Sequence, residues 1–400
     1  MKITEKTMTT NLVDEIASRL DITKEQYQLA VSHYVRLAEY LSSVLDKELH
    51  IYPQGSFMLG TVIKPYIKEA EADFDVDLVC EFTNDTEKTI FPKDLKKIVG
   101  DALKQSEVYS SKLDKEGKRC WTLKFPKNSN TGFHMDCLPC IPFTLLDINK
   151  KINLTHTSDF HNYEWRKSNP LELKEWFYNQ QKTVFQDIRE GIFNADRSVY
   201  NSIDEVPEND IKTPLQRVIQ LLKRHRDVYF SDKENEKYKP ISMIITILAA
   251  ELYEQEVDSY IALKNIIEEL SKYEEIFRNP THKSGAKNKE LIRFDGNKWY
   301  IINPVAQEEN FAEYWHEDDH ARAKAFFEWV SVLKFNFLRI LESLSVEDFQ
   351  RGISSSLKLE IPRDVIVNLG LVEQETLSRK YEDVPRVEVS IIKPVKPYRR

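Results

Sequence analysis

Glycine is scarce in this chain, and no long hydrophobic run is present. The 400 residues include 10 glycines, about a third of the usual share, which is too few for a sandwich or barrel built from many tight turns. The longest mostly apolar run, residues 241–250, is far shorter than the ~20 residues that span a bilayer. The opening residues MKITEKTMTTNL contain no apolar signal core. We therefore expect no membrane association and a cytoplasmic location.

Acidic residues outnumber basic residues in this chain. Lys and Arg number 57 against 65 Asp and Glu, so the net charge is −8. Affinity for long duplex nucleic acid comes mostly from phosphate neutralisation, so this chain is a poor candidate for that role, although it can still handle single nucleotides through a bound metal. Three of the four cysteines lie in apolar, strand-like segments, which suits reduced thiols in a core. The lone CxxC at Cys137–Cys140 lacks the second pair that a zinc site needs.

The hydrophobic pattern divides the chain into regions of different texture. Apolar residues recur every three or four positions over 23–46, which predicts one amphipathic helix that begins with a capping box at Thr23 and Gln26. Short β-like runs surround a helical stretch at 93–103, which predicts a small mixed domain. From about residue 173 the pattern is helical almost to the end, with one helix opening at Thr213-Pro214. We expect an α+β protein with four parts: a helical segment at 1–50, a mixed-sheet core at 51–172, a helical lobe at 173–377 and an extended tail at 378–400.

Three aspartates, Asp73, Asp75 and Asp77, alternate with apolar residues. Alternate side chains of a strand share a face, so the carboxylates point to one side and the apolar residues to the other. Carboxylates at i and i+2 suit a pair of divalent cations that catalyse phosphoryl displacement, and all-oxygen ligands favour Mg²⁺ or Mn²⁺ over zinc. A solvated strand face is the alternative, but aspartate is depleted in strands. The pattern leaves open whether the pair is Asp73 and Asp75 or Asp75 and Asp77.

Two further segments point to the same chemistry. Gln54-Gly55-Ser56 forms a small turn before a short predicted helix. Its glycine lets backbone N–H groups approach a phosphate, and Ser56 adds a hydroxyl at a helix N-terminus. Asp136 lies in the middle of an apolar strand, where an unpaired carboxylate is costly. If that strand neighbours the first, Asp136 completes a three-carboxylate metal site. An ordinary turn and an aspartate paired with lysine are the alternatives.

Together these motifs resemble the cGAS/DncV-like nucleotidyltransferases (CD-NTases) of the polymerase-β-like superfamily. The matching segments lie in order along nearly the whole chain, at 54–61, 74–79, 134–139, 221–227, 239–242, 303–304 and 310. The resemblance implies a bilobed α+β fold, in which a mixed-sheet polymerase-β-like core carries the aspartates and a mostly helical C-terminal lobe closes over the nucleotides.

The resemblance also implies a role for each matching residue. Asp75 and Asp77 would bind both metals, and Asp136 the metal that activates the attacking hydroxyl. The donor triphosphate would be held by residues of the first motif and of the helical half: Gln54, Gly55, Ser56, Lys223 and Ser242. Without the resemblance, Lys223 would be interpreted as one more cation in a surface run of basic residues.

The implied function is the synthesis of a cyclic di- or trinucleotide from ribonucleoside triphosphates, ATP or GTP foremost, with release of pyrophosphate. It would need Mg²⁺, with Mn²⁺ as a substitute, and would serve bacterial antiphage defence through a separate effector protein. We expect no duplex-DNA activator, because no zinc-binding cluster of His and Cys is present. We also expect a monomer. One alternative is a terminal nucleotidyltransferase that acts on RNA or protein, and another is a non-catalytic nucleotide-binding scaffold.

One further motif, His316–His320, matches the HExxH signature of zinc proteases. Its two central aspartates lie where a helix would begin. We therefore interpret it as a helix start rather than a metal site.

Overall fold

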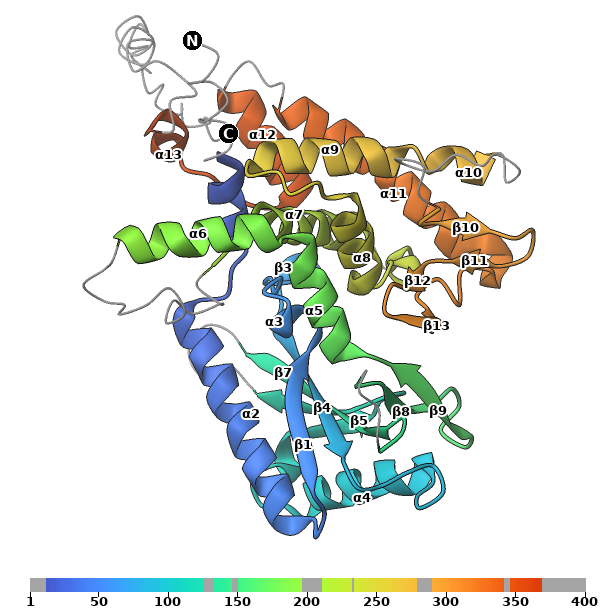
Figure 1. The fold of residues 1–400 in the computed structure, drawn as a ribbon. Helices are drawn as coiled ribbons and strands as arrows, with labels where there is room; N and C mark the ends of the chain where they lie inside the picture. The colour runs from blue at the N-terminus through green and yellow to red at the C-terminus, as the bar shows by residue number, and fades with distance from the viewer. Residues whose placement is uncertain are drawn as a thin grey trace, which may run out of the picture.

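The computed structural model describes residues 12–125, 132–145, 150–195, 211–231, 234–278, 290–341 and 346–368. Two lobes are visible in Figure 1, a lobe built on one sheet and a lobe of packed helices. This arrangement confirms the predicted α+β fold with a mixed sheet and a helical lobe. The boundaries predicted at residues 50 and 172 stay predictions, and the predicted tail at 378–400 lies outside the described residues.

Among the described residues, the main sheet has seven strands. Five of them lie side by side in the spatial order β1–β4–β7–β6–β5, β8 also pairs with β7, and β9 pairs with β8. The pair β4–β7 is parallel and the other pairs are antiparallel. The strands are β1 (Leu49–Gln54), β4 (Phe74–Phe82), β5 (Leu113–Glu116), β6 (Trp121–Phe125), β7 (Phe133–Pro142), β8 (Ile152–Thr157) and β9 (Tyr163–Ser168).

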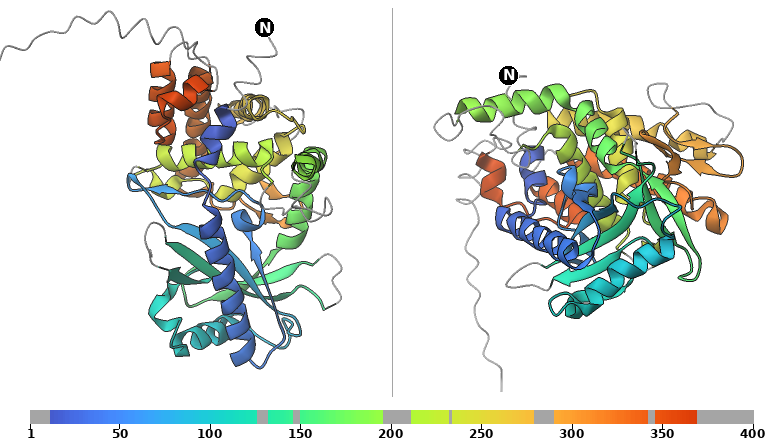
Figure 2. Two further views of the ribbon diagram at one scale, coloured as in Figure 1. Left: turned by 90° about the vertical axis from the view of Figure 1, so that its left-hand side faces the viewer. Right: turned by 60° about the horizontal axis from the view of Figure 1, so that its bottom comes forward.

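Helices α2 (Lys24–Val44) and α4 (Pro92–Gln105) cover one face of this sheet, as two views show (Figures 1 and 2). The capping box predicted at Thr23 and Gln26 opens α2. Alternate residues of β4 pack under the helices because a strand turns every second side chain to the same side: Phe74, Val76 and Leu78 are at most 2% exposed. The opposite face of β4 therefore carries Asp75 and Asp77.

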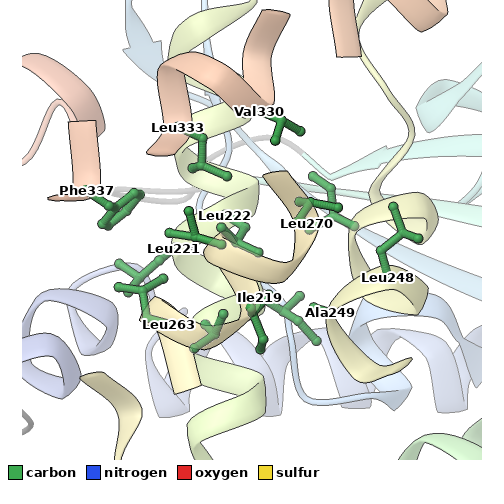
Figure 3. Close-up of a cluster of buried hydrophobic side chains, with 14 of the residues drawn as sticks. Ile219, Leu221, Leu222, Leu248, Ala249, Leu263, Leu270, Val330, Leu333 and Phe337 are labelled. Atoms are coloured by element: carbon green, nitrogen blue, oxygen red, sulfur yellow. The ribbon is translucent and has the colours of Figure 1, made fainter. Parts of the chain in front are cut away.

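The helical lobe buries its own core, part of which Figure 3 shows. Leu221 and Leu222 of α7 meet Leu263 of α9 and Leu333 of α11 in that view. The helices of this half of the chain are α5 (Pro170–Gln180), α6 (Lys182–Ala195), α7 (Pro214–Tyr229), α8 (Ser242–Leu252), α9 (Ser259–Ser271), α10 (Glu274–Arg278), α11 (Glu317–Leu341), α12 (Val346–Leu357) and α13 (Arg363–Asn368). The predicted start of α7 is confirmed by a capping box between Thr213 and Gln216.

Short elements complete the described fold. They are α3 (Gly55–Met58), the 3₁₀ turns η1 (Ser110–Lys112) and η4 (Glu236–Tyr238), and the small sheets β2 (Tyr66–Ile67) with β3 (Ala70–Glu71), β10 (Arg293–Phe294) with β11 (Trp299–Tyr300), and β12 (Ile302–Asn303) with β13 (Ala306–Asn310). Within the described ranges no helix combines the length and hydropathy that a membrane span requires.

The prediction of helix almost throughout the C-terminal half is wrong for β10 to β13. Asp295 accepts hydrogen bonds from the backbone of Asn297 and Lys298, and this turn chemistry favours a hairpin over a helix. Around the HExxH sequence, Asp318, Asp319 and His320 have φ of 50°, 54° and 59°, so His316 and His320 do not lie one turn apart on a right-handed helix.

The contact between α4 and β6 generates a stability prediction. A Cβ at Gly100 would lie 2.3 Å from Trp121 Cζ2, and Trp121 is held because its Nε1 donates to the Lys96 carbonyl. We expect Gly100→Ala to lower the free energy of unfolding by about 1–3 kcal/mol through overpacking. Urea unfolding would measure this. The matched control is Gly191→Ala in α6, where a Cβ meets nothing within 4 Å and should be neutral or stabilising. Equal effects at the two glycines would contradict the prediction.

Candidate active site

Asp77 and Asp136 lie side by side at the centre of the sheet. In the parallel pairing of β4 with β7, Asp77 is opposite Asp136 and Asp75 is opposite His134. Residues in register on neighbouring strands share a face and are about 5 Å apart, so all four side chains project from the face that α2 and α4 leave uncovered. Asp73 lies before β4, where its Oδ1 accepts from the Gly132 N–H at 3.0 Å. The geometry therefore favours Asp75 and Asp77 over Asp73 and Asp75 as the pair next to Asp136.

The surroundings of Asp77 disfavour its charged form. Burial, then the carboxylates of Asp136 and Asp75, raise the pKa of Asp77 to about 7, against the opposing effect of Lys223. Asp75 is more exposed, and its Oδ1 lies 3.3 Å from His134 Nδ1. The hydrogen bond to Asp75 is the main reason that the pKa of His134 is raised. Asp136 Oδ1 accepts from the Thr122 hydroxyl of β6.

Carboxylate oxygens are suitable ligands for a divalent cation such as Mg²⁺. Two carboxylates that share a site repel each other, and a cation relieves that repulsion. Among the described residues, no group of three or more His, Cys, Asp or Glu side chains is gathered closely enough to hold a metal ion. The structure assembles Asp77 with Asp136, while the Asp75 carboxylate is turned toward His134.

The glycine–serine turn lies against the same aspartate. β1 pairs with β4 so that Gln54 is opposite Asp77, and α3 begins at the next residue. Gly55 has φ +62°, and a Cβ there would lie 2.8 Å from Asp77 Oδ2. Both the backbone conformation and the space therefore require glycine. The result is a backbone that approaches the carboxylate closely.

Helix α7 holds the segment that follows this turn. Four consecutive carbonyls accept from side chains on α7 or just before it: Leu59 from Gln216 at 3.0 Å, Gly60 from Lys212 at 2.9 Å, Thr61 from Lys223 at 2.8 Å and Val62 from Gln220 at 3.0 Å. Gln216, Gln220 and Lys223 are four and three residues apart, so they share one face of the helix. The helical lobe thereby fixes the position of the turn relative to the sheet.

Lys223 and Ser242 have protein partners in this structure. Lys223 is 4% exposed, and burial, then Arg226, lowers its pKa to about 7 against the opposing effects of Asp227, Asp77 and Asp75. Ser242 Oγ accepts from Arg226 Nη1 at 2.8 Å. A cleft lies beside Asp77, between the sheet and the helical lobe. Gln54, Gly55 and Asp77 line it, whereas Ser56, Lys223 and Ser242 do not. To contact a phosphate, Lys223 would have to release the Thr61 carbonyl and Ser242 would have to release Arg226.

A cleft of about 830 Å³ extends from Asp77 between the sheet and the helical lobe. The sheet side contributes Leu138, Leu154 and His156, and the helical lobe contributes Pro240, Ile241 and Tyr314 among others. Six basic residues line it: Lys118, Arg119, Arg166, Lys167, Lys239 and Arg322. The sequence analysis did not group these residues because they come from four separate segments, and no local pattern brings them together.

Carboxylates near β13 pair with several of these cations across the cleft. Arg166 Nη1 lies 2.9 Å from Glu313 Oε1, and Lys167 Nζ lies 3.5 Å from Glu308 Oε1. The Ser168 hydroxyl donates to Glu309 Oε2 at 3.1 Å. The positive lining is therefore balanced by acidic groups that an incoming anion would have to compete with.

Known proteins resemble this chain in sequence. Residues 49–140 match the family described as "Cyclic GMP-AMP synthase DncV-like, nucleotidyltransferase domain". A relative named c-di-GMP synthase, from Roseivirga ehrenbergii, is 28% identical over 319 residues, which are 78% of this chain and 74% of the relative.

Solved structures show the same fold. The Bradyrhizobium diazoefficiens CD-NTase CdnG, in complex with GTP, superposes with a TM-score of 0.63 at 16% identity and covers 92% of this chain and 98% of its own. Escherichia coli DncV, in a form bound to 3′-deoxy GTP, gives a TM-score of 0.52 at 17% identity over 90% of this chain and 89% of its own. The protein is a nucleotidyltransferase with a polymerase-β-like fold. The resemblance to the CD-NTases that the sequence indicated is thereby confirmed.

The paired carboxylates generate a prediction about metal and pH. Because the pKa of Asp77 is raised above its unfolded value, the folded chain without metal binds an extra proton between about pH 4 and 7 and loses stability as the pH rises through that window. We expect Mg²⁺ to raise the unfolding temperature more at pH 8 than at pH 5, and Asp77→Asn to remove most of this difference. Differential scanning fluorimetry with Mg²⁺ or EDTA would measure it. A Mg²⁺ effect of the same size in Asp77→Asn would contradict the prediction.

The contacts of α7 generate a second prediction. Gln220 donates to the Val62 carbonyl and to Asp21 Oδ1. Gln220→Met removes both donors and leaves a buried carbonyl unpaired, so we expect the free energy of unfolding to fall by about 1–3 kcal/mol. The control is Gln186→Met on the exposed side of α6, where a change within about 0.5 kcal/mol is expected. Urea unfolding of both variants would test this, and a Gln220→Met variant as stable as the control would be evidence against it.

Proposed function

We propose that this protein makes a cyclic dinucleotide, with guanine among its bases, from ribonucleoside triphosphates and releases pyrophosphate. The observation that carries the proposal is the placement of Asp77 beside Asp136, with Gly55 against Asp77, at one end of a basic cleft. The name of the c-di-GMP synthase relative supports guanine, as do the GTP complexes of the CD-NTase structures. A cyclic trinucleotide and the use of ATP or pyrimidine nucleotides are the alternatives.

The reaction joins the ribose hydroxyl of one nucleotide to the α-phosphate of another. The hydroxyl loses its proton, the new P–O bond forms, and the bond to pyrophosphate breaks; a second round closes the ring. Most of the catalysis in such a reaction is positioning and charge neutralisation. Asp75, Asp77 and Asp136 would hold Mg²⁺, or Mn²⁺ in its place. Bound there, the ion would neutralise the triphosphate and acidify the attacking hydroxyl.

The residues of this chain have separate tasks in that scheme. Asp136, which is fixed by the Thr122 hydroxyl, orients the attacking nucleotide at the centre of the sheet. Gly55 and Ser56, with Gln54 before them, receive the donor triphosphate because their backbone lies against Asp77. Lys223 and Ser242 join this triphosphate site if they release Thr61 and Arg226.

The resemblance extends the proposal to biology. We propose that the protein acts as a monomer in the bacterial cytoplasm, and that its product switches on a separate effector during defence against phage.

The decisive experiment is to incubate the protein with all four ribonucleoside triphosphates and Mg²⁺, then analyse phosphatase-resistant products by chromatography and mass spectrometry. We expect a guanine-containing cyclic dinucleotide. Asp77→Asn and Asp136→Asn should lower its formation by at least about 100-fold, because each removes a ligand of the metal that carries the reaction. The control is Asp114→Asn, since Asp114 lies on β5 outside the cleft and pairs with Lys124.

Other outcomes would identify the alternatives. Extension of added RNA, or transfer of one nucleotide to a protein, without a cyclic product would favour a terminal nucleotidyltransferase. An unchanged biological effect of the Asp75→Asn, Asp77→Asn double variant would favour a non-catalytic scaffold.

A further inference from the structure

His156 of β8 is a buried polar side chain without a partner. It is 3% exposed, and neither Nδ1 nor Nε2 has a hydrogen-bond partner. Leaving a buried polar group unpaired costs about 1–3 kcal/mol. Burial, followed by the charges of Arg119 and Arg166, lowers its pKa, so the ring is neutral and offers one N–H donor and one acceptor nitrogen.

Strand geometry places this ring on the floor of the cleft. β8 runs antiparallel to β7, and their pairing ends where Leu154 is opposite Cys140, so His156, two residues further along, lies on the same face of β8 as Leu154 and toward the Leu138 end of β7. Leu138 and His156 both line the cleft, and Leu138 is two residues beyond Asp136 on the same face of β7. Two residue steps along β7 and one strand spacing across separate Asp136 from this position, which together amount to roughly 8 Å.

Arg119 approaches the same position from the turn between β5 and β6. The backbone N–H of Thr157 donates to the Lys118 carbonyl at 2.9 Å, which holds this turn beside the end of β8. The Arg119 side chain is 41% exposed, and its Nη1 lies 4.0 Å from Glu309 Oε1, too far for a hydrogen bond. Arg119 also lines the cleft, so its guanidinium has donors available to a ligand there.

When the imidazole turns its N–H toward the base, it and the Arg119 guanidinium present two donors side by side, and this arrangement distinguishes guanine from adenine. Guanine presents two neighbouring acceptors, O6 and N7, whereas adenine presents an acceptor at N7 and a donor at N6. We propose that His156 and Arg119 form a base-recognition site that selects guanine for the nucleotide whose ribose lies at Asp136. This inference rests on the proposed function, since it assigns a base to one of the two nucleotides joined.

Binding has to uncover the imidazole. The charged side chains that act on it are Arg119, Arg166, Glu164 and Glu313. Arg166 is held by both Glu164 and Glu313, whereas Arg119 has only a 4.0 Å ion pair with Glu309. Ion pairs of partly exposed side chains are weak, so Arg119 can turn toward a base at little cost.

The test uses two variants at this position and one matched control. His156→Leu removes both ring nitrogens, and His156→Gln keeps one donor and one acceptor. The control is Thr155→Val: Thr155 is the preceding residue of β8, is 0% exposed and also has an unpartnered hydroxyl, but it does not line the cleft. For each protein the affinities for non-hydrolysable GTP and ATP analogues are measured by titration calorimetry with Mg²⁺, and the base composition of the product is determined from mixed triphosphates.

We expect His156→Leu to lower the preference for GTP over ATP by about 10-fold, because one base-edge contact is lost. His156→Gln should retain part of the preference and Thr155→Val all of it. The unfolding temperature of His156→Leu should not fall, since the substitution removes a buried unpaired group. Should His156→Leu fail to fold, the binding ratio of His156→Gln relative to Thr155→Val decides the matter.

An unchanged GTP-to-ATP ratio in the His156 variants would overturn the inference. So would an equal loss of both nucleotides together with a lower unfolding temperature, because that pattern marks an ordinary core residue. Failure of the proposed function looks different: the wild-type protein would form no cyclic product, while the calorimetric ratio would still test the base site.

Discussion

The parallel pairing of β4 with β7 is the constraint on which the site depends. It places Asp77 opposite Asp136 although the two residues are 59 positions apart in the sequence. A shift of one residue in this register would turn Asp136 toward the apolar face, among Phe74, Val76 and Leu78. The stacked rings of Phe74 and Phe133, 5.6 Å apart, hold the register from that apolar side. The apolar packing on one face of the sheet therefore determines which side chains meet on the other face. Asp77 and Asp136 stay side by side because the core packing stabilises the register by more than their repulsion destabilises it.

Helix α7 belongs to the helical lobe and also contacts the segment that follows the glycine–serine turn of the sheet lobe. Its apolar residues, Leu221 and Leu222 among them, belong to the core of the helical lobe. Its polar face, with Gln216, Gln220 and Lys223, holds the carbonyls that follow the glycine–serine turn. Movement of the helical lobe would therefore carry the turn with it. A ligand that contacts both lobes would therefore act on the turn and on α7 together.

How much the sequence predicts depends on whether the signal is local. The capping boxes at Thr23 and Thr213, the alternation in β4 and the glycine at position 55 are local signals, and the structure shows each of them. The cleft lining is not local. Arg119, His156 and Arg166 come from a turn and two strands, and their common position follows from the pairing of β7 with β8 and of β8 with β9. The partners of Lys223 and Ser242 likewise depend on how α7 packs against residue 61 and on the approach of Arg226, which no spacing in the sequence reveals.

An acidic protein that handles polyanions has to concentrate positive charge where it is needed. Here the net charge is −8, yet six basic side chains line one cleft. Glu308, Glu309 and Glu313 lie within 4.0 Å of Lys167, Arg119 and Arg166 and neutralise part of that charge, so the cations do not repel one another at full strength. An anion that enters the cleft has to compete with these glutamates for the same cations. The pairs of Arg166 with Glu313 and of Lys167 with Glu308 also join β9 to the segment around β13, so the charge of the cleft and the contact between the lobes depend on the same side chains.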